Sequence, residues 1–482
     1  MVWTFVSSRT LRCLASHPWW YFAALSSSIL LTTMAASSAL AQASGPAVSP
    51  WSVSEALHAP GALKLSGSIR ARYEAIDGQT RPGFEPQSDL LNLRTTVFAE
   101  YDFGALRVGG ELYDSRVYGG NDRTPVTTNE VNTAELVQAY AALDLVRPFG
   151  PETSATVQAG RFLLNLGSRR LVAADEYRNT TNGYTGVRAD IAAPYRVKAT
   201  LIYTQPQTRL PDDLPSLLDN RIRTDRASRD AVLWGGVVSR ARALGPAMLE
   251  ISYYRFDERD APDRRTRDRA LDSWGLRILR DPNAGGWDYE AEVIRQTGTV
   301  RSGLGAADPE TKVLAGFAHA DMGYTFDHSW KTRVSGEFDY ASGDDDDARF
   351  GRFDSLFGMR RGDLAPAGLY NAVGRTNLVT PGLRIETTPS RRLDLFGVYR
   401  LMWLASDTDS FSTSGVRDPS GRSGDFAGQQ AEGRARYWLI QNALRLEANA
   451  VWLNKGRFLE TAPNAGAGED SHYVSLNLTA MF

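Results

Sequence analysis

The chain has 482 residues, of which 54 are basic and 56 acidic, and its formal net charge is −2. A balance this close to neutral argues against a nucleic-acid partner. Beyond an apolar stretch near the start there is no run of about 18 apolar residues, so the sequence offers no transmembrane helix. The chain contains one cysteine, Cys13, which excludes an internal disulfide.

The first 41 residues have the pattern of a secretory signal peptide. Two arginines precede an apolar stretch over about Trp19–Met34, and the small-residue triplet Ala39–Ala41 follows it. This is the order of a positive region, an apolar region and a cleavage site. We therefore expect residues 1–41 to be a signal peptide, and residues 42–62 to be a short periplasmic segment before the first strand. The alternative is an apolar stretch that stays attached as an anchor.

From residue 63 onward, segments of alternating polar and apolar residues follow one another. In Leu63–Ala75, for example, Ile69 and Tyr73 fall on one side while Arg70 and Arg72 fall on the other. This period of two predicts β-strands with one apolar and one polar face. The predicted strands cover residues 63–75, 91–101, 105–116, 132–145, 154–166, 182–191, 196–205, 230–240, 246–257, 272–280, 287–298, 312–326, 331–343, 376–388, 392–404, 430–439, 442–454 and 472–482.

The connections between these segments alternate between long and short. An even number of strands, short turns on one side and long loops on the other are typical of transmembrane β-barrels. We therefore predict an all-β protein, a single antiparallel barrel of about 18 strands over residues 63–482. Its turns would face the periplasm and its loops the exterior of a Gram-negative cell. It would contact outer-membrane lipids and lipopolysaccharide, and the barrel-assembly machinery through the terminal Phe482.

The predicted polar faces are rich in arginine. Only five of the 54 basic residues are lysine, which leaves 49 arginines. Arg70, Arg72 and Arg94 lie on the polar faces of the first two strands. Arginine keeps its charge at any pH and binds carboxylates through a planar fork, which suits a path for carboxylated sugars. The alternative is that an alanine- and arginine-rich proteome produces the same ratio.

The middle of the chain resembles a known family. The alginate export family of outer-membrane proteins has a similar series of a Gly-Arg strand, then Arg-Leu, Arg-Asn and Gly-Val-Arg. The matching segments are Gly160–Phe162, Leu166–Leu171, Tyr177–Asn179 and Tyr184–Arg188, and Ser342–Asp344, Phe353–Phe357 and Gly374–Leu378 resemble the long loop of that family. The resemblance implies an 18-stranded barrel whose arginine-lined constriction passes an anionic exopolysaccharide outward.

The resemblance also implies candidate site residues. Arg161, Arg170, Arg178 and Arg188 would line the pore or anchor a loop, and Arg384 is a further candidate because it falls on a polar face. The face of Arg161 stays open, since this residue shares the parity of the apolar positions before it unless a bulge intervenes.

Two other features suggest different chemistry. The acidic run Asp344–Asp347 could hold Ca²⁺, although a solvated acidic loop is the simpler interpretation. His319 and Asp321 share one strand face, and such a pair can act in catalysis, but no serine stands at a recognisable spacing. We therefore predict no enzyme, no catalytic residue, no metal and no cofactor. The alternative to polysaccharide export is a passive porin for small anionic solutes.

Overall fold

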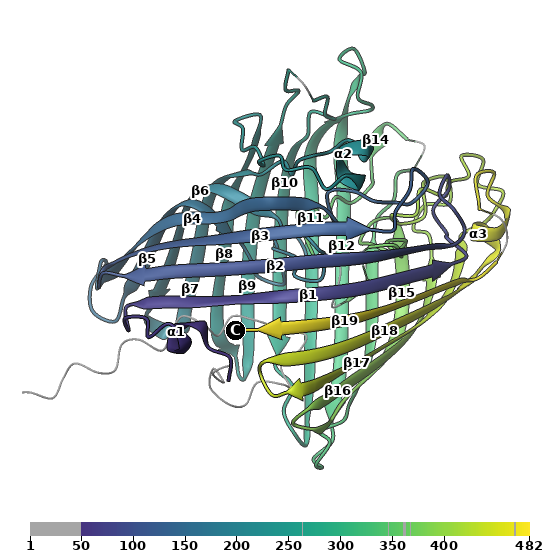
Figure 1. The fold of residues 1–482 in the computed structure, drawn as a ribbon. Coiled ribbons are helices and arrows are strands. Elements are labelled where there is room, and N and C mark those ends of the chain that lie inside the picture. The colour runs from purple at the N-terminus through teal and green to yellow at the C-terminus, as the bar shows by residue number, and fades with distance from the viewer. Residues whose placement is uncertain (1–49, 263, 346, 360–362, 367, 467–468) are drawn as a thin grey trace, which may run out of the picture. The chain divides into compact units, whose positions relative to one another are not determined.

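The computed structural model describes residues 50–262, 264–345, 347–359, 363–366, 368–466 and 469–482. The predicted signal peptide lies outside these residues. Within them, nineteen strands form one sheet, and eighteen of these pair antiparallel with their neighbours in a ring that β1 and β19 close (Figure 1). The remaining strand, β14, has two residues and pairs in parallel with β12.

Each predicted strand coincides with one strand of the ring, which confirms the predicted fold class. The strands of the ring are β1 (Leu63–Asp77), β2 (Ser88–Asp102), β3 (Leu106–Tyr118), β4 (Asn132–Val146), β5 (Ser154–Leu163), β6 (Gly183–Ala193), β7 (Val197–Pro206), β8 (Ala231–Leu244), β9 (Ala247–Glu258), β10 (Ala270–Arg280), β11 (Gly286–Arg301), β12 (Glu310–Thr325), β13 (Arg333–Ala341), β15 (Leu378–Ser390), β16 (Leu393–Trp403), β17 (Phe426–Ile440), β18 (Leu444–Lys455) and β19 (Ser471–Met481); β14 is Arg349–Phe350.

The alternation of side chains sets the two faces of the barrel wall. In β19, Tyr473 and Ser475 are buried, whereas Val474 and Leu476 are each 51% exposed. Exposed apolar side chains on the outside and buried polar ones on the inside are the arrangement of a barrel surrounded by lipid. Connections at one end are short, down to the two residues between β15 and β16, and those at the other end are long.

The described helices are short. They are α1 (Val53–Ala56) before β1, the 3₁₀ turn η2 (Pro194–Arg196), α2 (Leu214–Leu218) and α3 (Arg457–Thr461). In α1, Ser52 caps the N-terminus and the Ser54 hydroxyl contacts the backbone of Leu65, which holds the helix against β1. No helix among the described residues is long and apolar enough to cross a membrane.

Two long connections fold into the interior of the barrel, the lumen. They are residues 164–182 between β5 and β6 (the β5–β6 segment) and the described residues of 342–377 between β13 and β15 (the β13–β15 segment). Their apolar side chains pack against the wall in two clusters. The side chains that these segments contribute include Leu164, Leu166, Leu171 and Val172 from the first, and Phe353, Leu364, Leu369, Tyr370 and Val373 from the second.

The seam between β1 and β19 ends on Phe482. Its backbone exchanges two hydrogen bonds with Gly67, at 2.8 and 3.0 Å. A β-carbon added to Gly67 would lie 2.6 Å from the Phe482 ring and 2.4 Å from the backbone oxygen of Thr96. The aromatic ring therefore covers a glycine on the neighbouring strand, and the seam leaves no room for a side chain there.

Both Gly67→Ala and deletion of Phe482 should reduce the fraction of barrel that shows heat-modifiable migration on gels, because each disturbs the closing pair of strands. Gly336→Ala is the matched control, since no atom lies within 4 Å of a β-carbon built on that glycine. Equal folded fractions in all three variants and the parent would show that closure does not depend on this contact.

Candidate functional site in the lumen

The β5–β6 segment is anchored first to β1 and β2. Arg70 donates to the backbone oxygens of Glu176 and Arg178, at 3.1 and 2.7 Å. Arg94 on the neighbouring strand donates to the same two oxygens, at 3.1 Å each. Two guanidinium groups thus hold one stretch of main chain, and the acceptors in these four bonds are carbonyl oxygens without formal charge.

Arg72 adds a third contact to this anchor. It donates to the backbone oxygen of Tyr177 at 2.6 Å and lies 4.7 Å from the centre of the tyrosine ring. Its charge is balanced by Glu74, at 2.7 Å. The Tyr177 hydroxyl in turn meets the hydroxyl of Tyr473 on β19 at 3.1 Å. Arg72 therefore positions the segment and does not present an unbalanced charge.

Asn179 completes the attachment on this side. Its side-chain nitrogen donates to backbone oxygens of Leu93, Arg116 and Glu130, at 3.0, 3.2 and 2.9 Å, and the residue is fully buried. Buried amides are stable only when their hydrogen-bonding groups are satisfied. The Arg-Asn pair noted in the sequence thus contributes its asparagine as a buried anchor of the segment.

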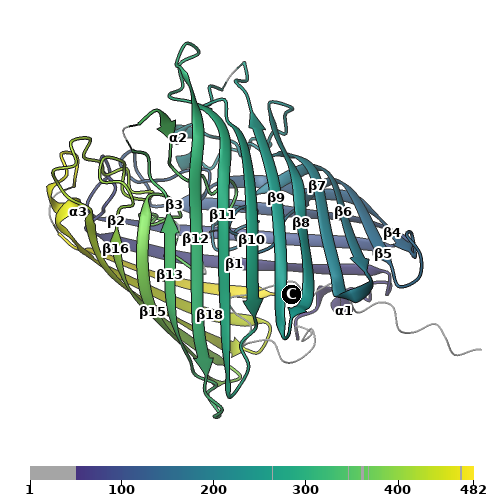
Figure 2. The same ribbon diagram turned by 180° about the vertical axis from the view of Figure 1, so that it is seen from behind.

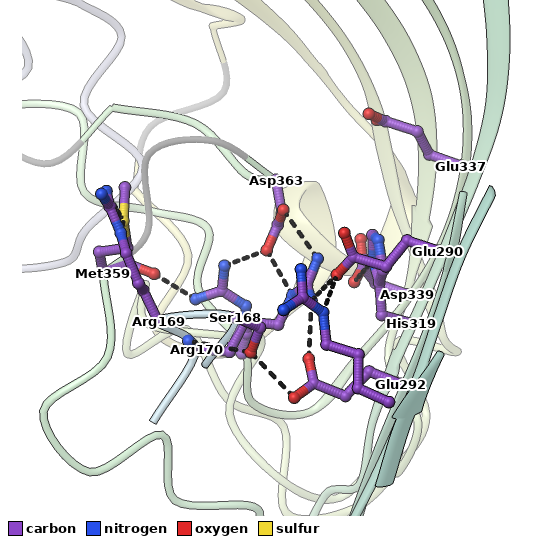
Figure 3. Close-up of polar contacts among 12 residues, drawn as sticks. Ser168, Arg169, Arg170, Glu290, Glu292, His319, Glu337, Asp339, Met359 and Asp363 are labelled. Atoms are coloured by element: carbon purple, nitrogen blue, oxygen red, sulfur yellow. Dashed lines mark hydrogen bonds and ion pairs between the residues drawn. The ribbon is translucent and has the colours of Figure 1, made fainter. Parts of the chain in front are cut away.

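The opposite end of the segment is held by Arg170 (Figure 3). Its guanidinium contacts Glu290 at 2.5 Å and Glu292 at 2.7 Å, both on β11, and Asp363 at 2.7 and 3.1 Å. Ser168 donates to Glu292 at 2.8 Å. Strands β8–β13 lie on the side of the barrel opposite β1 and β2 (Figure 2). The β5–β6 segment therefore spans the lumen from one wall to the other.

Opposite charges offset the cost of burying this cluster. Burial alone would lower the pKa of Arg170, which is 4% exposed, but Asp363, Glu290 and Glu292 raise it well above its ordinary value. Burial would likewise raise the pKa of Asp363, but Arg170 and Arg375 hold it well below its usual range. The contacts are thus charge-assisted hydrogen bonds, which are the stronger kind.

Asp363 belongs to the β13–β15 segment, so the cluster joins the two inward-folded segments. Arg375 of the same segment contacts the Asp363 carboxylate and the backbone oxygen of Met359. Arg400 on β16 donates to the backbone oxygen of Asp363 at 2.7 Å. Three arginines from three parts of the chain therefore surround this one residue.

Arg161 takes a position that the sequence left open. Strands β4, β5 and β6 pair without a register shift around it. It therefore follows Val157 and Ala159 on the outward face of β5, where its guanidinium contacts the carboxylate of Glu135 and the backbone oxygen of Leu136 at 2.9 Å. Arg161 therefore links β5 to β4 and to the connection between β7 and β8.

Asp225, whose backbone oxygen accepts a hydrogen bond from Arg161, should make the stability of the protein depend on pH. Burial, and then the neighbouring Glu135, raise the pKa of the Asp225 carboxyl to about 6. Between about pH 4 and 6 the folded state then binds this proton more tightly than the unfolded state, so stability falls as pH rises through that window. We expect the free energy of unfolding, measured by urea titration, to fall by up to ~3 kcal/mol across this pH window because of the Asp225 carboxyl.

Asp225→Asn should remove this pH dependence. The carboxyl accepts hydrogen bonds from Asn132 at 2.9 Å and from the backbone of Leu210 at 2.9 Å. The oxygen of the introduced amide can accept from Leu210, and a flip of the Asn132 amide lets its oxygen accept from the introduced nitrogen. If the variant and the parent have parallel stability profiles between pH 4 and 6, the effect does not come from Asp225.

Arg178 and Arg188 are each paired with an acid close in sequence. Arg178 lies 2.8 Å from Asp175 in the β5–β6 segment, and Arg188 lies 2.7 Å from Asp190 on β6. The Arg178 side chain is 13% exposed and that of Arg188 is 26% exposed. Arg188 lines the lumen, whereas Arg178 stays within the inward-folded segment.

Arg384 lies on the lumen face of β15. It donates to Glu386 at 2.8 Å and contacts Glu337 at 3.4 Å. Its guanidinium lies 4.5 Å from the centre of the Phe396 ring, and that of Arg434 lies at the same distance from this ring. Cation–π contacts of this kind hold both guanidinium planes against the wall.

The acid–histidine pair considered from the sequence has other partners. His319 meets Asp339 of the neighbouring strand at 2.8 Å, since the two residues are directly paired in the β12–β13 register. Asp321 instead contacts Arg333. Neighbouring strands therefore supply the partners of both residues.

Part of the acidic run Asp344–Asp347 can be located. Asp344 accepts from the backbone of Gly351 at 2.9 Å, and Asp347 accepts from the backbone of Arg349 at 2.7 Å. Asp346 lies outside the described residues. The carboxylates of Asp344 and Asp347 thus bond the backbone of their own segment, and among the residues that the structure describes no group of three metal-binding side chains comes together.

A group of arginines absent from the predicted site residues lines the wall formed by β17 and β18. Arg434 and Arg436 on β17 both contact Asp394 of β16, at 3.0 and 2.9 Å, and Arg445 on β18 lies 4.0 Å from Glu447. We call Arg434, Arg436 and Arg445 the basic wall. They lie within the predicted strands 430–439 and 442–454, but no motif distinguished them from other arginines.

The lumen faces of β11, β12 and β13 carry the opposite charge. Arg333 and His319 are their basic residues, and Arg333 contacts both Asp288 and Asp321. The acids on these faces are Asp288, Glu290, Glu292, Asp321, Glu337 and Asp339. An acidic face thus lies across the lumen from β1 and β2, and the loop-borne Arg170 compensates part of it.

A closed barrel with an apolar outer surface, a charged lumen and inward-folded segments defines a transport channel of the outer membrane of Gram-negative bacteria. The model of the family described as alginate export matches residues 62–474. The chain therefore belongs to the alginate export family. None of the curated proteins matches it.

Solved structures with a similar fold are outer-membrane proteins of Pseudomonas aeruginosa. OccK8 (OprE) has a TM-score of 0.56 at 10% identity, with 87% of this chain and 98% of that chain covered. OccK2 (OpdF) has a TM-score of 0.55 at 12% identity, with 87% and 97% covered. The structure of OccK2 with glucuronate has a TM-score of 0.53 at 12% identity, with 87% and 98% covered. At such identities the similarity extends to the fold.

Proposed function

We propose that this channel carries anionic, carboxylated sugars, and that an exopolysaccharide of the polyuronate class passes outward through it. The observation that carries the proposal is the concentration of arginines along one side of the lumen. Arg70, Arg94 and the basic wall are guanidinium groups on β1, β2, β17 and β18, and Asp394 and Glu447 are acids that contact the basic wall.

Guanidinium groups suit this cargo for a physical reason. Each can bind a carboxylate through two parallel hydrogen bonds, and its charge does not depend on pH. A row of such groups offers a polyanion successive contacts of similar strength, so that it can move from one to the next. Membership of the alginate export family supports the polymer as cargo.

The second candidate is uptake of small carboxylates. The structure of OccK2 with glucuronate favours it, because that protein has a similar fold and binds a single uronate. Both candidates require an anion-selective lumen, and they differ in how affinity depends on the length of the solute. The family and the porin-like fold favour transport over catalysis.

The test is ion selectivity of the purified channel in a planar bilayer, followed by block with uronate oligomers. We expect a reversal potential of the sign given by anions, and block that strengthens with oligomer length. Neutral oligosaccharides of equal length are the control. Block by monomers as strong as that by long oligomers would favour the small-solute porin, and cation selectivity would contradict both candidates.

A further inference from the structure

The carboxylate of Asp363 is bound as a sugar carboxylate would be. Arg170 meets it with two parallel hydrogen bonds, from Nε at 2.7 Å and from Nη2 at 3.1 Å, which is the fork geometry that arginine uses for carboxylate ligands. Arg375 contacts the same carboxylate from the other side. The arrangement is a carboxylate-binding site that is occupied by a side chain of the protein itself (Figure 3).

The bound carboxylate is not part of the barrel wall. Asp363 comes from the β13–β15 segment, whereas Arg170 comes from the β5–β6 segment, and their positions are 193 residues apart in the chain. The Asp363 side chain is 12% exposed, against 4% for Arg170. The ligand is therefore the more accessible member of the pair. Its departure would remove one contact between the two segments, which also share backbone hydrogen bonds between Phe357 and residues 171 and 173.

The arginines would stay in place if Asp363 left. Glu290 and Glu292 on β11 keep Arg170 fixed through bonds of 2.5 and 2.7 Å. Arg375 would keep its bond to the backbone oxygen of Met359. Loss of Asp363 would thus leave two guanidinium groups held in position, with one negative charge fewer beside them.

We propose that Arg170 and Arg375 form a binding site for a carboxylate of the transported anion, and that Asp363 occupies this site as an internal competitor. The proposal rests on the proposed function for the class of ligand. When a uronate takes the place of Asp363, one ion-paired contact between the two inward-folded segments is exchanged for a contact with the cargo.

Because Asp363 is tethered to the protein, its competition also determines which cargo can displace it. A ligand on a short segment acts at an effective concentration of the order of millimolar. A single uronate must reach that range to displace Asp363. A polyuronate held at other arginines presents its next carboxylate at a comparable effective concentration, so the site favours the polymer.

The experiment compares block by an oligoglucuronate in the parent channel and in Asp363→Asn. The amide keeps the shape of the side chain but removes the competing charge, so we expect block at about tenfold lower oligomer concentration. Adding Arg375→Gln to this variant should reverse the gain. Glu111→Gln is the matched control, because this lumen acid accepts from Gln138 at 2.6 Å and no arginine ion pair is lost.

The outcomes separate this inference from the proposed function. If the parent is blocked but Asp363→Asn differs from it by less than twofold, Asp363 is not a competitor and the inference falls. If neither is blocked, the carboxylated cargo itself is wrong. Asp363→Ser is the second variant. If both variants lose heat-modifiable migration, Asp363 is a structural residue and the inference is likewise overturned.

Discussion

Replacing Arg434, Arg436 and Arg445 together with glutamine should shift the channel from anion preference toward cations. Each of these lumen-facing guanidinium groups attracts an anion at a distance of several ångströms, and at an effective dielectric constant of 20 or more three such charges supply on the order of 1.4 kcal/mol after screening. That corresponds to about a tenfold change in the ratio of anion to cation permeability.

The shift in selectivity should be large because the variant leaves an acid without its basic partners. Asp394 loses both arginines that contact it and becomes an uncompensated negative charge in the lumen. The measurement is the reversal potential in a KCl gradient. The matched control replaces three exposed loop arginines, Arg221, Arg223 and Arg265, with glutamine. Equal reversal potentials in both variants would remove the basic wall from the path.

Arg170→Ala should be the most destabilising change among the predicted site residues. It leaves Glu290, Glu292 and Asp363 facing one another without their shared cation. Removal of one partner from a buried ion pair costs about 3–5 kcal/mol. We expect the β5–β6 segment to detach from β11, which should raise single-channel conductance and expose residues 164–182 to protease.

Arg188→Ala is the comparison for this variant. Arg188 and Asp190 form a pair of side chains that are each about a quarter exposed. A pair of that kind contributes up to about 1 kcal/mol. We therefore expect conductance and protease sensitivity close to those of the parent. If the two variants behave alike, the cluster around Arg170 does not hold the segment.

The ring of strands could be predicted because each strand is identified from its own residues alone. A period of two identifies each strand, and the lengths of the connections identify the two ends of the barrel. The partners within the wall need the register as well. His319 was considered together with Asp321 of its own strand, whereas its partner Asp339 lies opposite it on the next one. Parity alone does not supply that pairing.

The anchoring of the segments could not be predicted from sequence. Arg70 and Arg94 donate to backbone oxygens at residues 176 and 178, and every residue carries such an oxygen. No side-chain pattern marks those acceptors. The motif around Tyr177–Asn179 identified the right stretch of chain, but its role as an anchored crossing of the lumen required the fold.

The crossing of the lumen sets an order of events during assembly. The β5–β6 segment bonds to β1 and β2, 82 to 109 positions earlier in the chain, and to β11 and Asp363, 120 to 193 positions later. Its docking sites therefore face each other only once the strands between them have curved round. The contacts to β1 and β2 need only residues that precede the segment in the chain, whereas those to β11 and Asp363 need residues that follow it. Until those later residues arrive, the segment can be attached to one wall only.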